Sequence, residues 1–494
     1  MVAGVKAGGP GMADGRARRA AGGRLDAELG RLTLAERGDR GKAARAEAPR
    51  EAHAVFDPPA DRPDPVALLQ EQASSRLAQL LPVRYGRMLV SPFTYYRGAA
   101  LPMAADLAAT PTTGLVVQAC GDAHLSNFGV FASPERKVLF DVNDFDETLP
   151  GPWEWDVKRL AASLEVAGRD NGFSGKQRRQ VVTASTRRYR EAMRDFAGMS
   201  DLDVWYARAD VDLVQEAFGP QLTKRSRKNM EKYLAKARTR DSMQAFSKWC
   251  GVVEGELRII ADPPLIMPVS HLLPEEKDRL ALEARLDGLI AAYRRSLSGD
   301  HRVLLGRYHL ADVAIKVVGV GSVGTRCWIC LFTGREDTDP LLLQVKEAQP
   351  SVLAAYTAAS KYANQGQRVV EGQRLMQAAS DIFLGWQRIT QDIFDGNTYD
   401  YYIRQLRDWK FSLDIDAMNP ARMHTYGQLC AWTLARAHAR SGDSVAIAAY
   451  LGGSDVFDQA ITEFAGAYAN QNERDHQALT TAAATGRITA QSGL

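Results

Sequence analysis

The stretch 117–147, VQACGDAHLSNFGVFASPERKVLFDVNDFDE, restricts the fold most, because its polar groups follow short apolar runs. The runs at 116–120 and 138–142 are typical of β-strands, and SPER at 133–136 indicates a turn. Asp122, Asn127 and Asp144 are therefore expected where strands end. Phosphoryl transfer uses such a set, with one carboxylate as base and an amide and a second carboxylate holding Mg²⁺. The alternative is structural, since the same side chains can cap turns.

A second stretch, VAIKVVGVGSVGTRCWICLF at 313–332, predicts two strands joined by a loop that holds Gly319, Gly321 and Gly324. The G-x-G-x-x-G spacing occurs in both dinucleotide-binding proteins and kinases. A dinucleotide site needs a helix directly after the third glycine, but β-branched and aromatic residues follow here. A hairpin with a glycine loop is the lid that kinases place over ATP phosphates.

The next segment, PLLLQVKEA, predicts a third strand that ends at Lys346. A lysine at this place contacts the nucleotide phosphates in kinases. Its usual partner is a helical acid, and Glu371 is the nearest one, because strand alternation turns Glu347 away. The segment 399–410 is then expected to form an edge strand and a hinge for the adenine ring.

The motifs GDAHLSN and NDFDE resemble G-D-x-H-x-x-N and D-F-D of the aminoglycoside and choline phosphotransferases, which are distant relatives of protein kinases. From about residue 32 onward, the chain also resembles an uncharacterised bacterial family with SPFxYxRGAA, GDAHLxNFG, DFDETLPGPWEWDVKRL and KVVGVGSVGTR. The first resemblance implies that Asp156, at the start of a helix, helps to brace the catalytic loop. The alternative role of Asp156 is to interact with the helix dipole.

The order of these segments differs from that of an ordinary kinase. The glycine loop, lysine and hinge follow the 117–147 stretch by some two hundred residues, whereas in kinases they precede it. We therefore expect a circular permutation, which is tolerated when the original termini are close together. The helix YGQLCAWTLARAHARSGD is then expected to end near the strand that leads into Asp122. His438, Arg440 and Asp443 at its end either face the site or complement the helix dipole.

The expected fold class is α+β, a two-lobed protein-kinase-like fold with a circular permutation and a largely helical insertion. Residues 1–30 are expected to form a flexible basic tail, and 31–170 the half of the C-lobe with the catalytic loop and metal ligands. A mostly helical segment at 171–310 precedes an N-lobe-like β subdomain at 311–410, and 411–494 complete the C-lobe with helices.

Composition excludes several classes of function. The 494 residues carry a net charge of +3 from 62 basic and 59 acidic side chains, so bulk charge does not favour nucleic acid or a membrane surface. Five scattered cysteines fit a reducing compartment. No apolar run is long enough to span a membrane and no signal peptide is evident, so we expect a cytoplasmic protein.

Two basic features leave alternatives open. Arg97, in SPFTYYRGAA, is expected on an aromatic-buttressed turn, where it either binds a phosphate or carboxylate or pairs with an acid of 141–147. The basic stretch 223–240 is either a solvated helix face or a surface for an anionic substrate.

The leading hypothesis is an ATP- and Mg²⁺-dependent phosphotransferase with an unknown small-molecule or protein substrate. The alternatives are nucleotidyl transfer or nucleotide binding without turnover, a metallophosphatase, and a helical scaffold that uses the 223–240 face. The candidate site residues are Asp122 and His124 for catalysis; Gly319, Gly321, Ser322, Gly324, Lys346, Glu371 and Gln405 for the nucleotide; Asn127, Asp144 and Asp146 for the metal; and Arg97 and Asp156 for support or substrate.

Overall fold

The computed structural model describes residues 31–210, 242–253, 255–273, 275–317, 321, 323–336, 338–392, 394–406, 413–491 and 493. Several predictions lie outside these residues. They concern the tail at 1–30, the basic stretch 223–240, Gly319, Ser322 and the hinge at 407–410.

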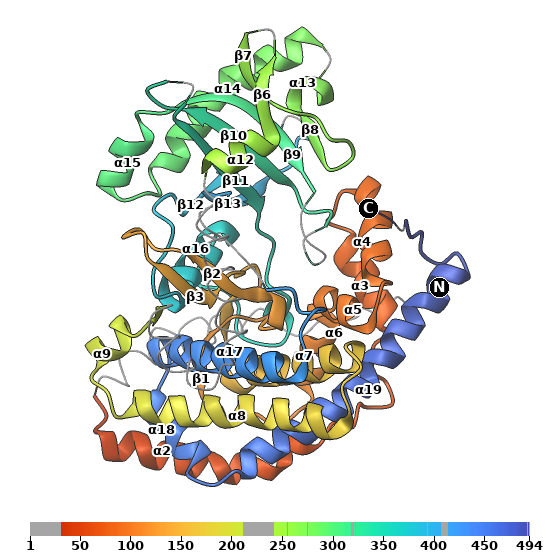
Figure 1. Cartoon of the computed structure of the whole chain (residues 1–494), viewed down its shortest axis with the longest axis vertical. Helices are drawn as coiled ribbons and strands as arrows, with labels where there is room; N and C mark the ends of the chain where they lie inside the picture. Colours follow the sequence, from red (N-terminus) through yellow and green to blue (C-terminus); the bar gives the residue numbers. More distant parts are fainter. Residues whose placement is uncertain are drawn as a thin grey trace, which may run out of the picture.

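The described chain is α+β and has two lobes, which Figure 1 shows one above the other. The upper lobe holds a six-stranded antiparallel sheet in the order β12-β13-β11-β10-β9-β8. The predicted glycine hairpin and lysine strand are confirmed as its strands β9, β10 and β11. The strands are β8 (Ile266–Pro268), β9 (His309–Lys316), β10 (Cys327–Thr333), β11 (Pro340–Glu347), β12 (Gly385–Ile389) and β13 (Tyr399–Gln405).

The edge of this sheet corrects one prediction. Strand β13 was expected at the edge, but it pairs with both β11 and β12, and β12 forms the edge instead. Helix α16 (Gln365–Met376) lies between β11 and β12 in sequence, and Figure 1 shows it below the sheet, toward the lower lobe. Gly366 lets this helix approach β13, because a Cβ there would lie 2.0 Å from the Tyr401 carbonyl oxygen.

The remaining elements of the upper lobe flank the sheet. Short strands β6 and β7 pair with each other, and helices precede and follow them. These elements are α12 (Ser242–Trp249), β6 (Cys250–Val253), β7 (Glu256–Ile259), α13 (Val269–Leu272), α14 (Glu276–Arg294) and α15 (Gly299–Leu305).

The lower lobe is built from helices around two small antiparallel sheets, β1-β4 and β2-β3-β5. The predicted strands at 116–120 and 138–142 are confirmed as β1 and β3, and the turn between β2 and β3 contains Arg136 at φ 62°. The strands are β1 (Val116–Ala119), β2 (Phe128–Ala132), β3 (Val138–Val142), β4 (Leu149–Pro152) and β5 (Ala209–Asp210).

Helices of both chain ends pack around these sheets. None of the described helices is both long and apolar enough to cross a membrane. The helices are α2 (Leu34–Glu47), α3 (Pro65–Ala73), α4 (Leu81–Met88), α5 (Pro92–Gly98), α6 (Ala100–Ala108), α7 (Trp153–Asp170), α8 (Gly175–Ala197), α9 (Asp201–Tyr206), α17 (Pro420–Ser441), α18 (Ser444–Leu451) and α19 (Val456–Ala484).

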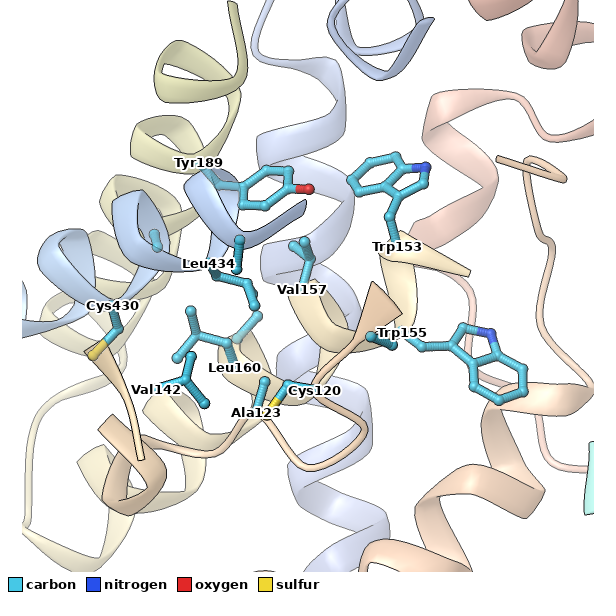
Figure 2. Close-up of a cluster of buried hydrophobic side chains, with 14 of the residues drawn as sticks. Cys120, Ala123, Val142, Trp153, Trp155, Val157, Leu160, Tyr189, Cys430 and Leu434 are labelled. Carbon is cyan, nitrogen blue, oxygen red and sulfur yellow. The ribbon is translucent and has the colours of Figure 1, made fainter. Parts of the chain in front are cut away.

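The main hydrophobic core lies between α7, α8, α17 and the strands of the lower lobe. Figure 2 shows part of it, with Trp153 and Tyr189 on one side and Val142 and Cys430 on the other. Trp153 stacks on Tyr189 with ring centroids 5.6 Å apart. Aromatic pairs of this kind add stability beyond their buried area. This packing fixes α7, which supplies residues to the site.

Helix α7 is buried along nearly its whole length, although it carries charged side chains. A buried charge requires a partner, and the acids and bases of α7 have one. Glu154 accepts a hydrogen bond from the Thr113 amide at 2.6 Å, for example. The charged side chains of α7 therefore hold neighbouring loops in place through hydrogen bonds.

Two further features bear on the predictions. The SPFTYYRGAA segment forms helix α5 rather than a turn, because Ser91 caps it in a capping box and Pro92 occupies the first position. The end of α17 lies beside β1, as predicted. A Cβ on Gly442 would lie 2.6 Å from Val117 Cγ1, and Ser441 Oγ accepts from the Gln118 amide at 3.2 Å.

Candidate active site

The loop between β1 and β2 begins with a braced turn. Gly121 has φ +81°, and a Cβ there would lie 2.4 Å from the Glu147 carbonyl oxygen, so glycine is required. Asp156, near the start of α7, accepts hydrogen bonds from the Cys120 amide at 2.6 Å and the Gly121 amide at 2.9 Å. The carboxylate thus holds the two residues that precede Asp122.

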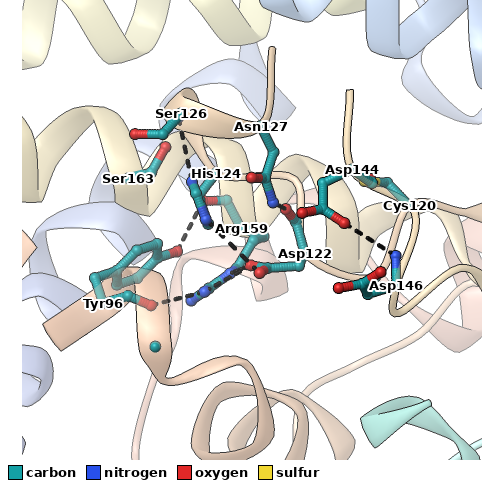
Figure 3. Close-up of polar contacts among 12 residues, drawn as sticks. Tyr96, Cys120, Asp122, His124, Ser126, Asn127, Asp144, Asp146, Arg159 and Ser163 are labelled. Carbon is teal, nitrogen blue, oxygen red and sulfur yellow. Dashed lines mark hydrogen bonds and ion pairs between the residues drawn. The ribbon is translucent and has the colours of Figure 1, made fainter. Parts of the chain in front are cut away.

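Asp122 is bound by a buried arginine that the sequence did not indicate. Arg159 of α7 donates to Asp122 Oδ1 through Nε at 2.8 Å and through Nη2 at 2.7 Å. Figure 3 shows Arg159 lying between Asp122 and Tyr96, whose carbonyl oxygen accepts another bond at 2.7 Å. Burial raises the pKa of Asp122, and the charge of Arg159 opposes that rise. Arg159 thereby fixes the position of one carboxylate oxygen.

His124 lies behind Asp122 and is buried. Its Nδ1 accepts from the Ser126 amide at 3.2 Å, and its Nε2 lies 3.7 Å from Asp122 Oδ2. Burial lowers the pKa of His124 well below its ordinary value, and Arg159 adds to the effect. The ring is therefore neutral and presents an N–H toward the carboxylate.

Asn127 and Asp144 are held next to this loop by the hairpin of β2 and β3. Asn127 Nδ2 donates to the Asp122 carbonyl oxygen at 2.8 Å, and the Asn143 amide donates to the Asn127 carbonyl oxygen at 2.8 Å. Asp144 Oδ1 accepts from the Asp146 amide at 3.2 Å. Figure 3 shows Asn127, Asp122, Asp144 and Asp146 gathered in one place.

Lys346, at the end of β11, meets this group from the upper lobe. Its Nζ forms an ion pair with Asp146 Oδ2 and lies 3.8 Å from Asp144 Oδ2. Tyr402 of β13 donates to Asp146 Oδ1 at 2.7 Å. Burial disfavours the ammonium, but the two aspartates outweigh it and raise the pKa of Lys346. The same lysine lowers the pKa of Asp146 against the effect of burial, so Lys346 and Asp146 are both charged at neutral pH.

A cleft lies between the two lobes at this point. It is lined by residues of both lobes and includes five acids, four strong bases and one glycine of the loop between β9 and β10. The charged and key lining residues are Arg76, Arg97, Asp122, His124, Asn127, Asp144, Asp146, Glu147, Gly321, Lys346, Glu347 and Arg404.

The glycine loop is docked onto the lower lobe. The Leu77 amide donates to the Gly324 carbonyl oxygen at 2.7 Å, and Arg76 Nη1 donates to the Val323 carbonyl oxygen at 2.6 Å. Val323 is fully buried against Leu80 and Val83. Gly324, at φ +90°, and Gly321 belong to this loop; a Cβ on Gly321 would lie 3.3 Å from the Arg97 carbonyl oxygen. The loop thus covers one side of the cleft.

Two candidate nucleotide-binding residues lie elsewhere. Glu371 lies 3.4 Å from Arg374 in an ion pair, and Lys346 pairs with Asp146 instead. The rotation of α16 about its axis explains this, because it points Arg368 and not Glu371 toward the 141–147 segment. Arg368 Nη2 donates to the Asp146 carbonyl oxygen at 2.8 Å.

Gln405 also lies away from the cleft. Strand alternation on β13 points the Tyr402 and Arg404 side chains to the cleft side, and Arg404 Nη1 donates to the Asn143 carbonyl oxygen at 3.2 Å. The Gln405 amide donates to Asp381.

The residues at the end of α17 are divided between the site and contacts outside the cleft. His438 Nε2 lies 3.1 Å from Asp156 Oδ2, and its Nδ1 lies 2.7 Å from the Tyr189 hydroxyl, so it supports the brace from behind. Arg440 stacks on Trp205 at 4.0 Å, and Asp443 pairs with Arg37 at 2.9 Å. These two do not line the cleft.

Glu147 is a further residue that the sequence did not single out as functional. Its Oε2 accepts from the Val352 amide at 2.7 Å. Burial raises the pKa of Glu147 to about 7, against the effect of that hydrogen bond and of Arg368. A carboxyl that titrates near neutral pH in a cleft is a candidate functional group. Its position directly after the D-F-D motif was the available signal.

The oxygen donors of the cleft fit a cation of the Mg²⁺ type. No group of three or more His, Cys, Asp or Glu suited to a metal is found among the described residues. The oxygen donors are instead the carboxylates of Asp144 and Asp146 and the amide oxygen of Asn127, whose nitrogen is already engaged. The carboxylate of Asp146 is also contacted by Lys346 and Tyr402. Mg²⁺ uses one or two carboxylates together with substrate phosphates and waters.

Comparison with known proteins gives one match. A family described as "Uncharacterized protein conserved in bacteria (DUF2252)" matches residues 76–482, which include every residue of the cleft discussed above. No curated protein and no solved structure matches.

Proposed function

The chain belongs to this bacterial family, and we propose from its cleft that it is an ATP- and Mg²⁺-dependent phosphotransferase acting on a hydroxyl-bearing substrate. One observation carries the proposal. Lys346 of the upper lobe meets Asp144 and Asp146 in the cleft that Asp122 and Asn127 also line. A lysine, a metal-binding pair and a base in one cleft are the parts that phosphoryl transfer requires.

The order of elements supports a kinase-like fold with a circular permutation. A glycine loop joins β9 and β10, Lys346 lies next to the last residue of β11, and α16, β12 and β13 follow in that order. Ser441, at the end of α17, accepts a hydrogen bond from the Gln118 amide of β1 at 3.2 Å. A chain joined at this contact would pass from the lysine strand and hinge through α17 into the catalytic loop, which is the usual order in kinases.

Asn127, Asp144 and Asp146 would hold Mg²⁺, and Lys346 would contact the nucleotide phosphates. When bound, the metal ion would neutralise charge on the phosphate oxygens. Gly321 and Gly324 lie in the loop that covers this part of the cleft, where a glycine backbone allows close approach to phosphates. Arg404 adds a second positive charge beside Lys346.

Asp122 would accept the proton of the attacking hydroxyl. Arg159 binds Oδ1 and Asp156 holds the preceding turn, so Oδ2 remains available to the substrate. Burial raises the pKa of Asp122, which improves its match to a base working near neutral pH. A positioned base contributes roughly a hundredfold to ten-thousandfold to the rate.

A second candidate function is nucleotide binding without phosphoryl transfer, or transfer of a nucleotidyl group. The observation that favours it is the ion pair of Asp122 with Arg159 at 2.7 Å, because a guanidinium stabilises the ionised carboxylate and reduces its affinity for a proton. In this second function, Asp122 holds Arg159 and the loop in place and does not act as a base.

Isotope transfer tests these functions directly. The full-length protein is incubated with Mg²⁺ and ATP labelled either in the γ-phosphate or in the α-phosphate, with cell extract as the source of acceptor. Phosphoryl transfer predicts labelled product from γ-labelled ATP only, and Asp122→Asn abolishes it while ATP binding remains. Label from α-labelled ATP indicates nucleotidyl transfer, and binding without either label indicates a regulator. Wild-type turnover in Asp122→Asn would remove Asp122 from the role of base.

A further inference from the structure

Arg97 differs from the other cations of the cleft because its guanidinium forms no hydrogen bond or ion pair with the described residues; Asp416 and Asp122 attract it only across a longer distance. It occupies the last turn of α5 and lines the cleft together with Asp122 and His124. Its Nε is buried without a hydrogen-bond partner, and within the described part of the chain no hydrogen bond or ion pair of its guanidinium is found. The alternative in which Arg97 pairs with an acid of 141–147 is therefore not realised. Burial lowers the pKa of Arg97, and the attraction of Asp416 and Asp122 opposes that effect without a direct ion pair. A half-buried guanidinium without a carboxylate in contact gains from a ligand that supplies one.

The other cations are already engaged. Lys346 pairs with Asp146, Arg404 donates to Gln344 Oε1 at 3.1 Å, and Arg76 donates to the Val323 carbonyl oxygen at 2.6 Å. Arg76 and Arg404 are thus tied to the glycine loop and to the sheet. Among these four, Arg97 is the one whose guanidinium forms no hydrogen bond or ion pair with the described residues, so its terminal nitrogens are the ones left for a ligand.

The position of Arg97 associates it with the acceptor side of the cleft. Its neighbour Tyr96 accepts a bond from Arg159 through its carbonyl oxygen at 2.7 Å, and Arg159 in turn binds Asp122. Lys346 and Tyr402 contact Asp146 from β11 and β13 of the upper lobe, whereas Arg97 belongs to α5 of the lower lobe. An anion bound at Arg97 would therefore lie close to the carboxylate that accepts the hydroxyl proton.

We propose that the acceptor carries its own anionic group, a phosphate or a carboxylate, and that Arg97 binds this group while Asp122 engages the hydroxyl. The inference rests on the proposed function and specifies its substrate class. A cationic acceptor such as an aminoglycoside or choline would be repelled by the guanidinium at this place. Arginine binds phosphate and carboxylate in the two-pronged geometry that fixes orientation.

Calorimetric titration with inorganic phosphate tests this assignment. The full-length protein is first saturated with Mg²⁺ and the non-hydrolysable analogue adenylyl imidodiphosphate, which occupies the positions of all three nucleotide phosphates. We expect saturable phosphate binding that Arg97→Gln weakens roughly 30-fold or more, as for a buried charge pair. Arg97→Lys retains part of the affinity. Arg187→Gln, at an exposed arginine on α8 outside the cleft lining, leaves it unchanged.

Three results would overturn the inference. The same titration is made with the complex of ADP and Mg²⁺. Phosphate that binds this complex but not the analogue complex would occupy the place of the nucleotide γ-phosphate and not an acceptor site. Absence of phosphate binding in both complexes, or equal binding by wild type and Arg97→Gln, would remove Arg97 as an anion site. If the analogue itself does not bind, the proposed function fails, whereas phosphate binding by the nucleotide-free protein still reports on Arg97.

Discussion

Lys346 Nζ donates to Asp146 Oδ2 although the two residues are 200 positions apart in sequence. Asp146 Oδ1 accepts a second bond from the Tyr402 hydroxyl at 2.7 Å, and Asp144 lies 3.8 Å from the lysine. A strand of the upper lobe and a loop of the lower lobe are thereby joined through charges. The cleft exists because these two distant segments meet, and the following predictions depend on that contact.

Asp146→Asn should destabilise the protein, whereas Glu371→Gln should not. The first change removes one of the two carboxylates that balance the buried Lys346 ammonium, at a cost of roughly 2 kcal/mol because Asp144 remains. The second changes an ion pair with Arg374 at the surface, and we expect a loss below about 0.5 kcal/mol. Urea denaturation measures both free energies of unfolding. A larger loss in Glu371→Gln would restore the helical acid as the partner of Lys346.

Asp156→Asn should lower the free energy of unfolding by roughly 3 kcal/mol. The carboxylate accepts from the Cys120 and Gly121 amides, and an amide side chain must turn one N–H toward a donor. Asp195→Asn on the exposed face of α8 is the control and should change stability by less than about 0.5 kcal/mol. Equal effects in the two variants would show that the bonds of Asp156 do not stabilise the loop.

Gly121→Ala and Gly172→Ala separate steric contact from backbone strain. Both glycines have positive φ, +81° and +72°, so alanine costs about 1 kcal/mol at either site. A Cβ at Gly172 meets nothing within 4 Å, but one at Gly121 lies 2.4 Å from the Glu147 carbonyl oxygen. Thermal or urea denaturation should therefore show at least twice the loss for Gly121→Ala. Similar losses would mean that the turn before Asp122 can relax.

Glu147 should make stability fall as the pH rises. Burial raises its pKa from 4.5 to about 7 in the folded protein, so the folded state binds the proton more tightly than the unfolded chain. The stabilisation is complete below about pH 4.5 and is lost as the pH rises through 7. Glu147→Gln lacks this titration, so the difference between wild type and variant should change across that interval. A difference that is constant with pH would contradict the raised pKa.

Local patterns predicted much of the fold. Strands β1, β3, β9, β10 and β11 were predicted because apolar and β-branched runs end at turn residues, and α7 begins at a predicted proline break. Asp156 was assigned its bracing role by resemblance, and its hydrogen bonds to Cys120 and Gly121 agree with that role. Lys346 was assigned to the same site as Asp144 and Asp146 because the lysine strand and the 117–147 stretch each matched a part of a kinase.

Features that depend on long-range packing could not be predicted. The side-chain direction of Arg404 and Gln405 depends on the register of β13 with β11, and a shift of one residue exchanges the two. Glu371 was chosen by proximity in sequence, but the rotation of α16 places Arg368 toward the 141–147 segment. Arg159 lies three residues after Asp156 on the same face of α7, and only the docking of that helix against the loop identifies it as the partner of Asp122.

Thermal unfolding with nucleotide tests most directly whether the two lobes form one nucleotide site. The melting temperature is measured for the wild type, Lys346→Ala and Asp144→Ala, each with ATP plus Mg²⁺ and with ATP plus EDTA. Nucleotide at a hundred times its dissociation constant adds about 2.7 kcal/mol to the stability of the wild type. We predict a Mg²⁺-dependent rise in melting temperature that both variants lose. The same melting temperature with and without nucleotide in the wild type, or an undiminished rise in both variants, would contradict a nucleotide site between β11 and the 141–147 segment.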